Sequence, residues 1–127
     1  MKYLLDANAM IWYFEDSKNL PQRVAKIIDD PLNTILISSL SLWEIVIKMM
    51  LGKLNLKMSF DELLATINEY DFEIIQIEND YLKELFNVQS IHKDPFDRLL
   101  IATAVADKLT LITSDDDIQK YNVKWIW

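Results

Sequence analysis

The sequence predicts a three-layer α/β/α domain with a central, mainly parallel β-sheet. Short apolar runs alternate along the chain with longer stretches of helical periodicity, which is the pattern of helices connecting parallel strands. The chain has 127 residues, of which 51% are hydrophobic and 26% charged, an ordinary balance for one globular domain. No repeat, linker or low-complexity segment interrupts it, so we expect a single domain over residues 1–127.

The first part of the chain predicts a strand, two helices and a second strand. Residues 2–5 form a short buried strand, and residues 8–16 form a helix with a strongly apolar face. A second helix is expected over residues 21–30, because Pro21 suits a first helical position and Pro31 stops the helix. Residues 34–38 are apolar and bounded by turn-forming residues, which indicates a second buried strand.

Two helices are expected next. The first covers residues 42–51, with Ser41 as its cap and Gly52 ending it in the left-handed conformation. The second covers residues 59–70 and opens with the Ser-x-x-Glu spacing of a capping box. In the remaining chain, Asp94 and Pro95 open a long apolar helix. The expected elements there are a strand at 73–77, helices at 79–87 and 95–108, a strand at 109–113, a short helix from 115 or 116, and a strand near 123–126.

Composition excludes several chemistries. The chain has no Cys and only one His, His92, so neither a structural zinc site nor a cysteine nucleophile is expected. Gly52 is the only glycine, which excludes phosphate-binding glycine loops and the nucleophile elbow. The net charge of -7 argues against a broadly basic nucleic-acid-binding surface. No apolar run is long enough to cross a membrane, and the absence of cysteine agrees with a cytoplasmic location.

Carboxylates follow the predicted strands. Asp6 ends the first strand, Asp115 follows a late strand, and Glu44 and Asp97 lie near helix starts, with Asp94 beside the latter. The carboxyl ends of parallel strands meet at one edge of the sheet, where ligands bind. Clustered acids repel one another unless a cation lies between them, and hard divalent cations prefer oxygen ligands. The pattern therefore indicates metal-dependent phosphodiester cleavage.

Each acid also has a structural interpretation that the sequence leaves open. Asp6, Asp94 and Asp115 are each placed to cap a helix, and Glu44 completes a capping box with Ser41. We expect Asp94 to act mainly as a cap, and Asp117 is a weaker alternative to Asp115. We expect Trp43 and Ile45 to pack in the hydrophobic core and His92 to lie in a loop. The acids carry the functional prediction through their joint placement.

The chain resembles PIN domain nucleases, and among them the VapC-like toxins of toxin–antitoxin pairs. The resemblance runs essentially end to end and is strongest at His92-Lys93-Asp94-Pro95-Phe96-Asp97-Arg98. Shorter matches are Leu4-Leu5-Asp6-Ala7-Asn8, Ser41-Leu42-Trp43-Glu44-Ile45 and Leu111-Ile112-Thr113-Ser114-Asp115. Ala7 departs from the family pattern, which often has Thr or Ser directly after the first Asp.

The resemblance implies cleavage of RNA with Mg²⁺, for which Mn²⁺ can substitute. It implies Asp6, Glu44, Asp97 and Asp115 as metal-site and catalytic acids, of which we expect Asp6 and Asp97 to be the main ligands. Asp94 and Asn8 are auxiliary positions. Four cations are candidates to guide the RNA backbone, although each also suits an ordinary solvated position. They are Lys48, Lys53, Lys93 and Arg98.

The resemblance also implies a cognate antitoxin protein and a homodimer. The antitoxin would lie on apolar helix surface, with Trp12, Tyr13 and Phe14 as anchors, and would present a basic side chain to the acids. Core packing or a dimer contact is the alternative role of these aromatic residues. A functional alternative is a catalytically silent PIN-like module that only binds protein, suggested by the acidic charge and by Ala7.

Overall fold

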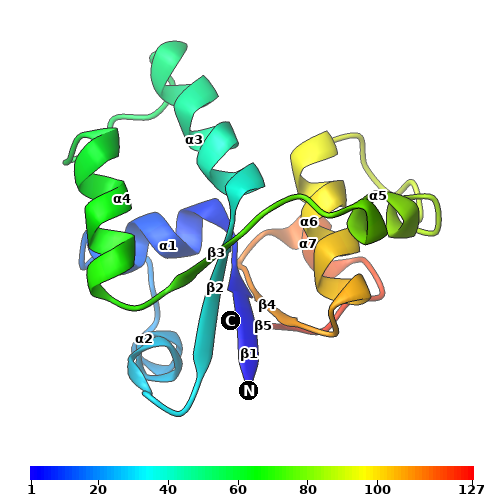
Figure 1. The fold of residues 1–127 in the computed structure, drawn as a ribbon, viewed down its shortest axis with the longest axis horizontal. Helices are drawn as coiled ribbons and strands as arrows, with labels where there is room; N and C mark the ends of the chain where they lie inside the picture. Colours follow the sequence, from blue (N-terminus) through cyan, green and yellow to red (C-terminus); the bar gives the residue numbers. More distant parts are fainter.

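A computed structural model describes residues 1–127 and confirms the predicted three-layer α/β/α architecture (Figure 1). The central sheet has five strands in the order β3-β2-β1-β4-β5, and each neighbouring pair is parallel. β1 therefore occupies the middle of the sheet, with Leu4 opposite both Leu36 and Leu111. The strands are β1 (Lys2–Leu5), β2 (Thr34–Ser38), β3 (Glu73–Ile75), β4 (Thr110–Ile112) and β5 (Trp125–Ile126).

Seven helices cover the two faces of the sheet. Figure 1 views the sheet nearly edge-on, with α1 to α4 on one side and α5 to α7 on the other. None of these helices combines the length and the apolar character that a membrane span needs. The helices are α1 (Ala7–Phe14), α2 (Gln22–Asp29), α3 (Ser39–Met50), α4 (Phe60–Glu69), α5 (Asn79–Leu85), α6 (Pro95–Ala106) and α7 (Asp116–Gln119).

The central strand separates two hydrophobic cores because successive strand residues point to opposite faces. Tyr3 and Leu5 pack with buried residues of α1, α2 and α4. Leu4 packs on the other face with buried residues of α6 and α7. Leu4 and Leu5 are completely buried, as expected for a strand covered by helices on both sides. The two cores hold β1 rigidly, and its carboxyl end is the base of the site described below.

Several predicted helix boundaries are confirmed, and one is wrong in a way that affects the site. Ser59 and Glu62 form the predicted capping box at the start of α4, and Gly52 has the predicted positive φ of 69°. α3, however, begins at Ser39, and it is Ser38 that caps it by accepting the N–H of Leu40. The predicted cap, Ser41, lies inside the helix, because β2 passes into α3 without a loop.

Candidate active site

The four acids singled out in the sequence belong to segments that meet at the carboxyl edge of the sheet. Asp6 follows β1, Asp115 follows β4, and Glu44 lies in the second turn of α3, which continues from β2. β2, β1 and β4 are adjacent and parallel, so their carboxyl ends share an edge. Asp97 arrives from the opposite direction. It lies in the first turn of α6, which then runs back to the amino end of β4.

Burial and neighbouring negative charges together raise the pKa values of Asp6 and Asp97. Burial raises the pKa of Asp6 from 3.8 to about 6, and the charges of Asp115 and Glu44 add to the rise. Burial also raises the pKa of Asp97 from 3.8 to about 6, with further contributions from Asp94, Asp115 and Glu44. Glu44 and Asp115 thus act on both buried carboxylates, which puts the four acids in one electrostatic environment.

Thr113 links Asp6 to Asp115 and was missed in the sequence. Its fully buried hydroxyl group favours the ionised form of the Asp6 carboxylate, and its Oγ1 accepts the backbone N–H of Asp115 at 3.0 Å. The hydrogen bonds from Thr113 and from the N–H of Ala9 both favour ionised Asp6, and so they oppose the rise in its pKa. The sequence feature that could have indicated this role is a residue with a hydroxyl group directly after a predicted buried strand. Thr113 provides a hydroxyl beside Asp6, where Ala7 has none.

The capping roles of Asp6, Asp94 and Asp115 are confirmed. Asp6 Oδ1 accepts the N–H of Ala9 at 2.7 Å, and Asp94 Oδ1 accepts the N–H of Asp97 at 3.1 Å. Asp115 Oδ1 accepts two N–H groups of the first turn of α7, at 2.8 and 3.2 Å. Each cap uses Oδ1, so capping and a role in the site are compatible for the same side chain.

The capping-box interpretation of Glu44 is wrong, because α3 starts earlier than predicted. Glu44 instead forms an ion pair with Lys48 one turn later, with Oε2 and Nζ 3.3 Å apart. The Glu44 side chain is mostly buried, at 16% exposed, whereas Lys48 is 46% exposed. Lys48, one of the four cations predicted to contact RNA, is therefore ion-paired with Glu44, one of the four acids.

His92 contacts Asp97 directly. It lies in the loop before α6, as predicted, but its ring is turned inward, with Nε2 3.0 Å from Asp97 Oδ2. The opposite ring nitrogen, Nδ1, is 2.7 Å from the hydroxyl of Tyr121. The contact was not predicted from the sequence, because the loop conformation at residues 92–94 decides whether the His92 ring turns toward Asp97.

Of the other three predicted cations, two are exposed and one is half-buried. Lys53, beyond the end of α3, and Lys93, beside His92, are both exposed. Arg98 is half-buried, and its Nη2 donates to the backbone carbonyl of Val88 at 3.3 Å. Asn8 is exposed in the first turn of α1, two residues after Asp6.

Trp43 lies outside the core, contrary to prediction, whereas Ile45 is buried as expected. Trp43 is 56% exposed and packs edge-on against Phe96, with ring centroids 5.1 Å apart. These two residues immediately precede Glu44 and Asp97 in sequence. Exposed Trp43 and partly buried Phe96 therefore join α3 to the start of α6.

The donor chemistry of the site fits a divalent cation such as Mg²⁺. Carboxylate oxygens are the ligands Mg²⁺ prefers, and the structure gives no hydrogen bond to Glu44 Oε1, Asp97 Oδ1 or Asp115 Oδ2. As placed, however, no three acid or histidine side chains lie close enough together to hold an ion. Binding of a metal ion therefore requires some of these side chains to rotate. The partly exposed ion pair between Glu44 and Lys48 costs little free energy to break, so Glu44 can rotate readily.

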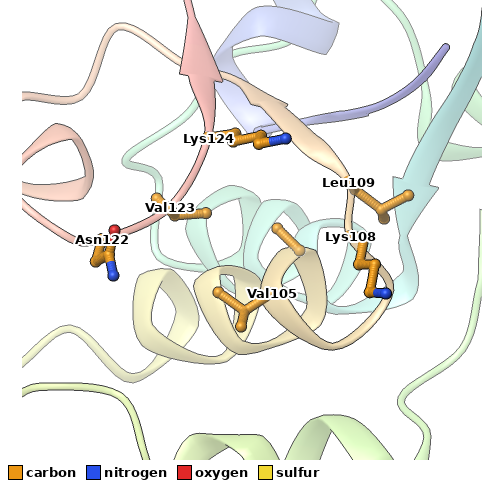
Figure 2. Close-up of a pocket in the computed structure, with 7 residues that line it drawn as sticks. Val105, Lys108, Leu109, Asn122, Val123 and Lys124 are labelled. Carbon is orange, nitrogen blue, oxygen red and sulfur yellow. The ribbon is translucent and has the colours of Figure 1, made fainter.

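A separate pocket of about 370 Å³ lies at the opposite end of the sheet (Figure 2). Lys108 and Leu109 line it just before β4, and Val123 and Lys124 line it just before β5. It therefore opens at the amino ends of these strands and has no carboxylate or imidazole in its lining. It is not part of the acidic site.

Solved structures share this fold over nearly the whole chain. VapBC2 from Rickettsia felis, bound to a promoter DNA fragment, has 19% identity and a TM-score of 0.75, covering 100% of this chain and 99% of that chain. A toxin–antitoxin complex from Klebsiella pneumoniae has 21% identity and a TM-score of 0.66, with 98% and 96% covered. VapBC-5 from Mycobacterium tuberculosis has 18% identity and a TM-score of 0.63, with 98% and 97% covered.

At these identities the structural likeness establishes the fold. No curated protein matches the chain. The sequence profile of the PIN domain matches residues 3–124, which includes strands β2, β3 and β4, all seven helices and all four acids. The chain belongs to the PIN domain family.

Proposed function

We propose that this protein is a metal-dependent endoribonuclease that acts as the toxin of a toxin–antitoxin pair in the cytoplasm. The observation that carries the proposal is the pair formed by buried Asp6 and partly buried Asp97, whose pKa values are both raised to about 6 beside the charges of Glu44 and Asp115. Membership of the PIN domain family supports the nuclease activity. The similar structures named as toxin–antitoxin complexes support the biological role.

Each acid has a distinct task in this proposal. Asp6 and Asp97 are the main ligands of Mg²⁺ or Mn²⁺, and Glu44 and Asp115 complete the site directly or through water. When bound, the ion lowers the pKa of a water molecule and stabilises negative charge on the phosphate. Glu44 or Asp115 orients the attacking water, and Thr113 keeps Asp6 ionised and in position. Asp94 and Asn8 support the site from the helix starts.

RNA would be held by a few local contacts, because the net charge of -7 leaves no broad basic surface. Lys53 and Lys93 are free to approach phosphates, while Lys48 and Arg98 would first leave or share their present partners. The exposed face of Trp43 provides a platform on which an unpaired base can stack. Stacking favours single-stranded RNA over a duplex as the substrate.

An antitoxin segment would lie on the aromatic residues at the end of α1, which also pack against the core. Tyr13, Phe14, Tyr70 and Phe72 form a cluster with ring centroids 5.3 to 5.9 Å apart. A neighbouring pocket of about 690 Å³ is lined by Trp12 and by residues of α2. A partner that fills it with apolar side chains and extends a basic side chain to the acids would inhibit the enzyme. We also predict a homodimer, and a monomer by light scattering at micromolar concentration would contradict that prediction.

A catalytically silent, protein-binding PIN module is the second candidate. The observation that favours it is the absence of a preformed group of three metal-binding side chains. The second argument for a silent module was that Ala7 has no hydroxyl group. That argument is weaker because Thr113 provides a hydroxyl group beside Asp6. Titration calorimetry with Mn²⁺ separates the two candidates, since a silent module gives no saturable binding.

Labelled single-stranded RNA tests the proposal. The wild-type protein should cleave it with Mg²⁺ or Mn²⁺ and should stop when EDTA is added. Asp6→Asn and Asp97→Asn should each abolish cleavage, and Asp61→Asn, which changes an exposed acid of α4, should leave it unchanged. Undiminished cleavage by either site variant would refute the assignment.

A further inference from the structure

We propose that Tyr121 holds His92 in the tautomer that carries hydrogen on Nε2, and that His92 thereby positions Asp97 for metal binding. This inference rests on the proposed function, because it concerns one of the two acids assigned as main ligands. His92 and Tyr121 are positioning residues in this arrangement. Neither is a ligand, and neither contacts the substrate.

Three contacts define the arrangement. The Tyr121 hydroxyl is 3.0 Å from the backbone nitrogen of His92 and 2.7 Å from its Nδ1. On the other side of the ring, Nε2 is 3.0 Å from Asp97 Oδ2. Tyr121 is 5% exposed, and the side chains of His92 and Asp97 are 16% and 18% exposed, so water competes little for these groups.

The inventory of donors assigns the protons. The backbone N–H of His92 can only donate, so the Tyr121 oxygen accepts that bond. If Nδ1 also carried hydrogen, the hydroxyl would accept twice, and its own proton would point into the protein with no acceptor. A buried donor without a partner is strongly disfavoured. The hydroxyl therefore donates to Nδ1, and Nε2 carries the hydrogen that is donated to Asp97.

This proton assignment determines which Asp97 oxygen is available. Oδ2 accepts from His92, and the structure gives no hydrogen bond to Oδ1. The backbone N–H of Asp97 is held by Asp94, so both ends of the residue are restrained. The acids Asp94, Asp115 and Glu44 all bear on the Asp97 carboxylate. Their repulsion would rotate an unrestrained side chain outward, and the bond from His92 opposes that rotation.

The restraint originates in the hydrophobic core. Tyr121 packs with Leu100 and Ile118 in the core shared by α6 and α7, and its ring meets that of His92 edge-on at 5.4 Å. A carboxylate at the rim of the site is thus fixed through two aromatic rings to the interior. Outer contacts of this kind orient metal ligands, and their loss commonly weakens metal binding 10–100-fold.

Nuclear magnetic resonance tests the tautomer directly, because His92 is the only histidine. Long-range ¹H–¹⁵N correlation of the metal-free protein, at a pH at which the imidazole ring is neutral, should show hydrogen on Nε2 and none on Nδ1. Tyr121→Phe should displace the Nδ1 resonance, which loses its donor. Tyr81→Phe is the matched control, since it removes an equally buried hydroxyl that donates to Asp107 instead. Hydrogen on Nδ1 in the wild type, or an Nδ1 resonance unmoved by Tyr121→Phe, would overturn the proposal.

Metal binding and kinetics test the positioning role. His92→Ala should weaken Mn²⁺ binding, measured by calorimetry, by about tenfold or more, and His92→Gln should restore most of it, because an amide N–H can replace Nε2–H. His92→Ala should lower kcat for RNA and leave KM nearly unchanged. Equal Mn²⁺ affinity in the wild type and His92→Ala would overturn the positioning role and leave the nuclease proposal intact. No Mn²⁺ binding by the wild type would overturn both.

Discussion

Replacing Asp6 by Asn should stabilise the metal-free protein at neutral pH while abolishing its activity. The folded-state pKa of about 6 lies above the ordinary value of 3.8, so the folded protein holds this proton more tightly than the unfolded chain. The associated stability is fully present below about pH 4 and is lost as the pH rises through about 6. At neutral pH the ionised Asp6 therefore opposes folding, and an uncharged side chain removes that opposition.

The size of the effect follows from the pKa difference. At about 1.4 kcal/mol per pKa unit, the cost of ionised Asp6 is about 3 kcal/mol at neutral pH. Asn caps helices as well as Asp does, so the bond from the N–H of Ala9 should survive the substitution. For a chain of 127 residues, 3 kcal/mol corresponds to a rise in Tm of roughly 10 °C.

Urea or thermal unfolding in EDTA, followed by circular dichroism at about pH 4 and about pH 7.5, measures the difference between variant and wild type. The free energy of unfolding should differ by about 3 kcal/mol at the higher pH and by almost nothing at the lower. Asp61→Asn, at an exposed position of α4, should change stability by less than about 0.5 kcal/mol at both. A variant that is destabilised at neutral pH, or equally affected at both, would refute the electrostatic reasoning.

Three further predictions concern the metal, the core and the substrate. Affinity for Mn²⁺, measured by calorimetry, should rise as the pH increases through about 6, because the two buried acids must be ionised to bind; an unchanged affinity across that range would contradict their role as ligands. Leu4→Ala should lower the free energy of unfolding by about 2–5 kcal/mol in urea titrations, since Leu4 is completely buried in the central strand. Trp43→Ala should raise KM for single-stranded RNA several-fold and leave Mn²⁺ affinity unchanged, while Phe86→Ala, at an exposed aromatic residue directly after α5, should alter neither.

Elements whose signals are local were predictable from the sequence. The capping box of Ser59 and Glu62, the left-handed Gly52 and the Asp94 cap each depend on a few adjacent residues, and all three are present. The convergence of the acids was also predictable, because parallel topology alone brings strand ends to one edge. These predictions needed no knowledge of side-chain packing.

Features set by contacts between distant segments were not predictable. Ser41 and Ser38 are equally good caps by residue type, and only the length of β2 decides where α3 begins. Tryptophan is a large apolar residue type that often packs in a core, but the position of Trp43 on α3 directs its side chain outward against Phe96. The roles of Thr113 and His92 depend on neighbours brought close by the folded sheet and by α7. No sequence spacing encodes those neighbours.

The place of β1 in the middle of the sheet has a consequence for when the acidic site can form during synthesis of the chain. β1 precedes the other strands of this sheet in sequence, yet Tyr3 pairs with Thr110 of β4, which follows α6. The long loop that this pairing closes makes it a late step in folding. A nascent chain that has been synthesised only as far as α6 lacks Asp115, so under the proposed function it would have no complete acidic site and no ribonuclease activity.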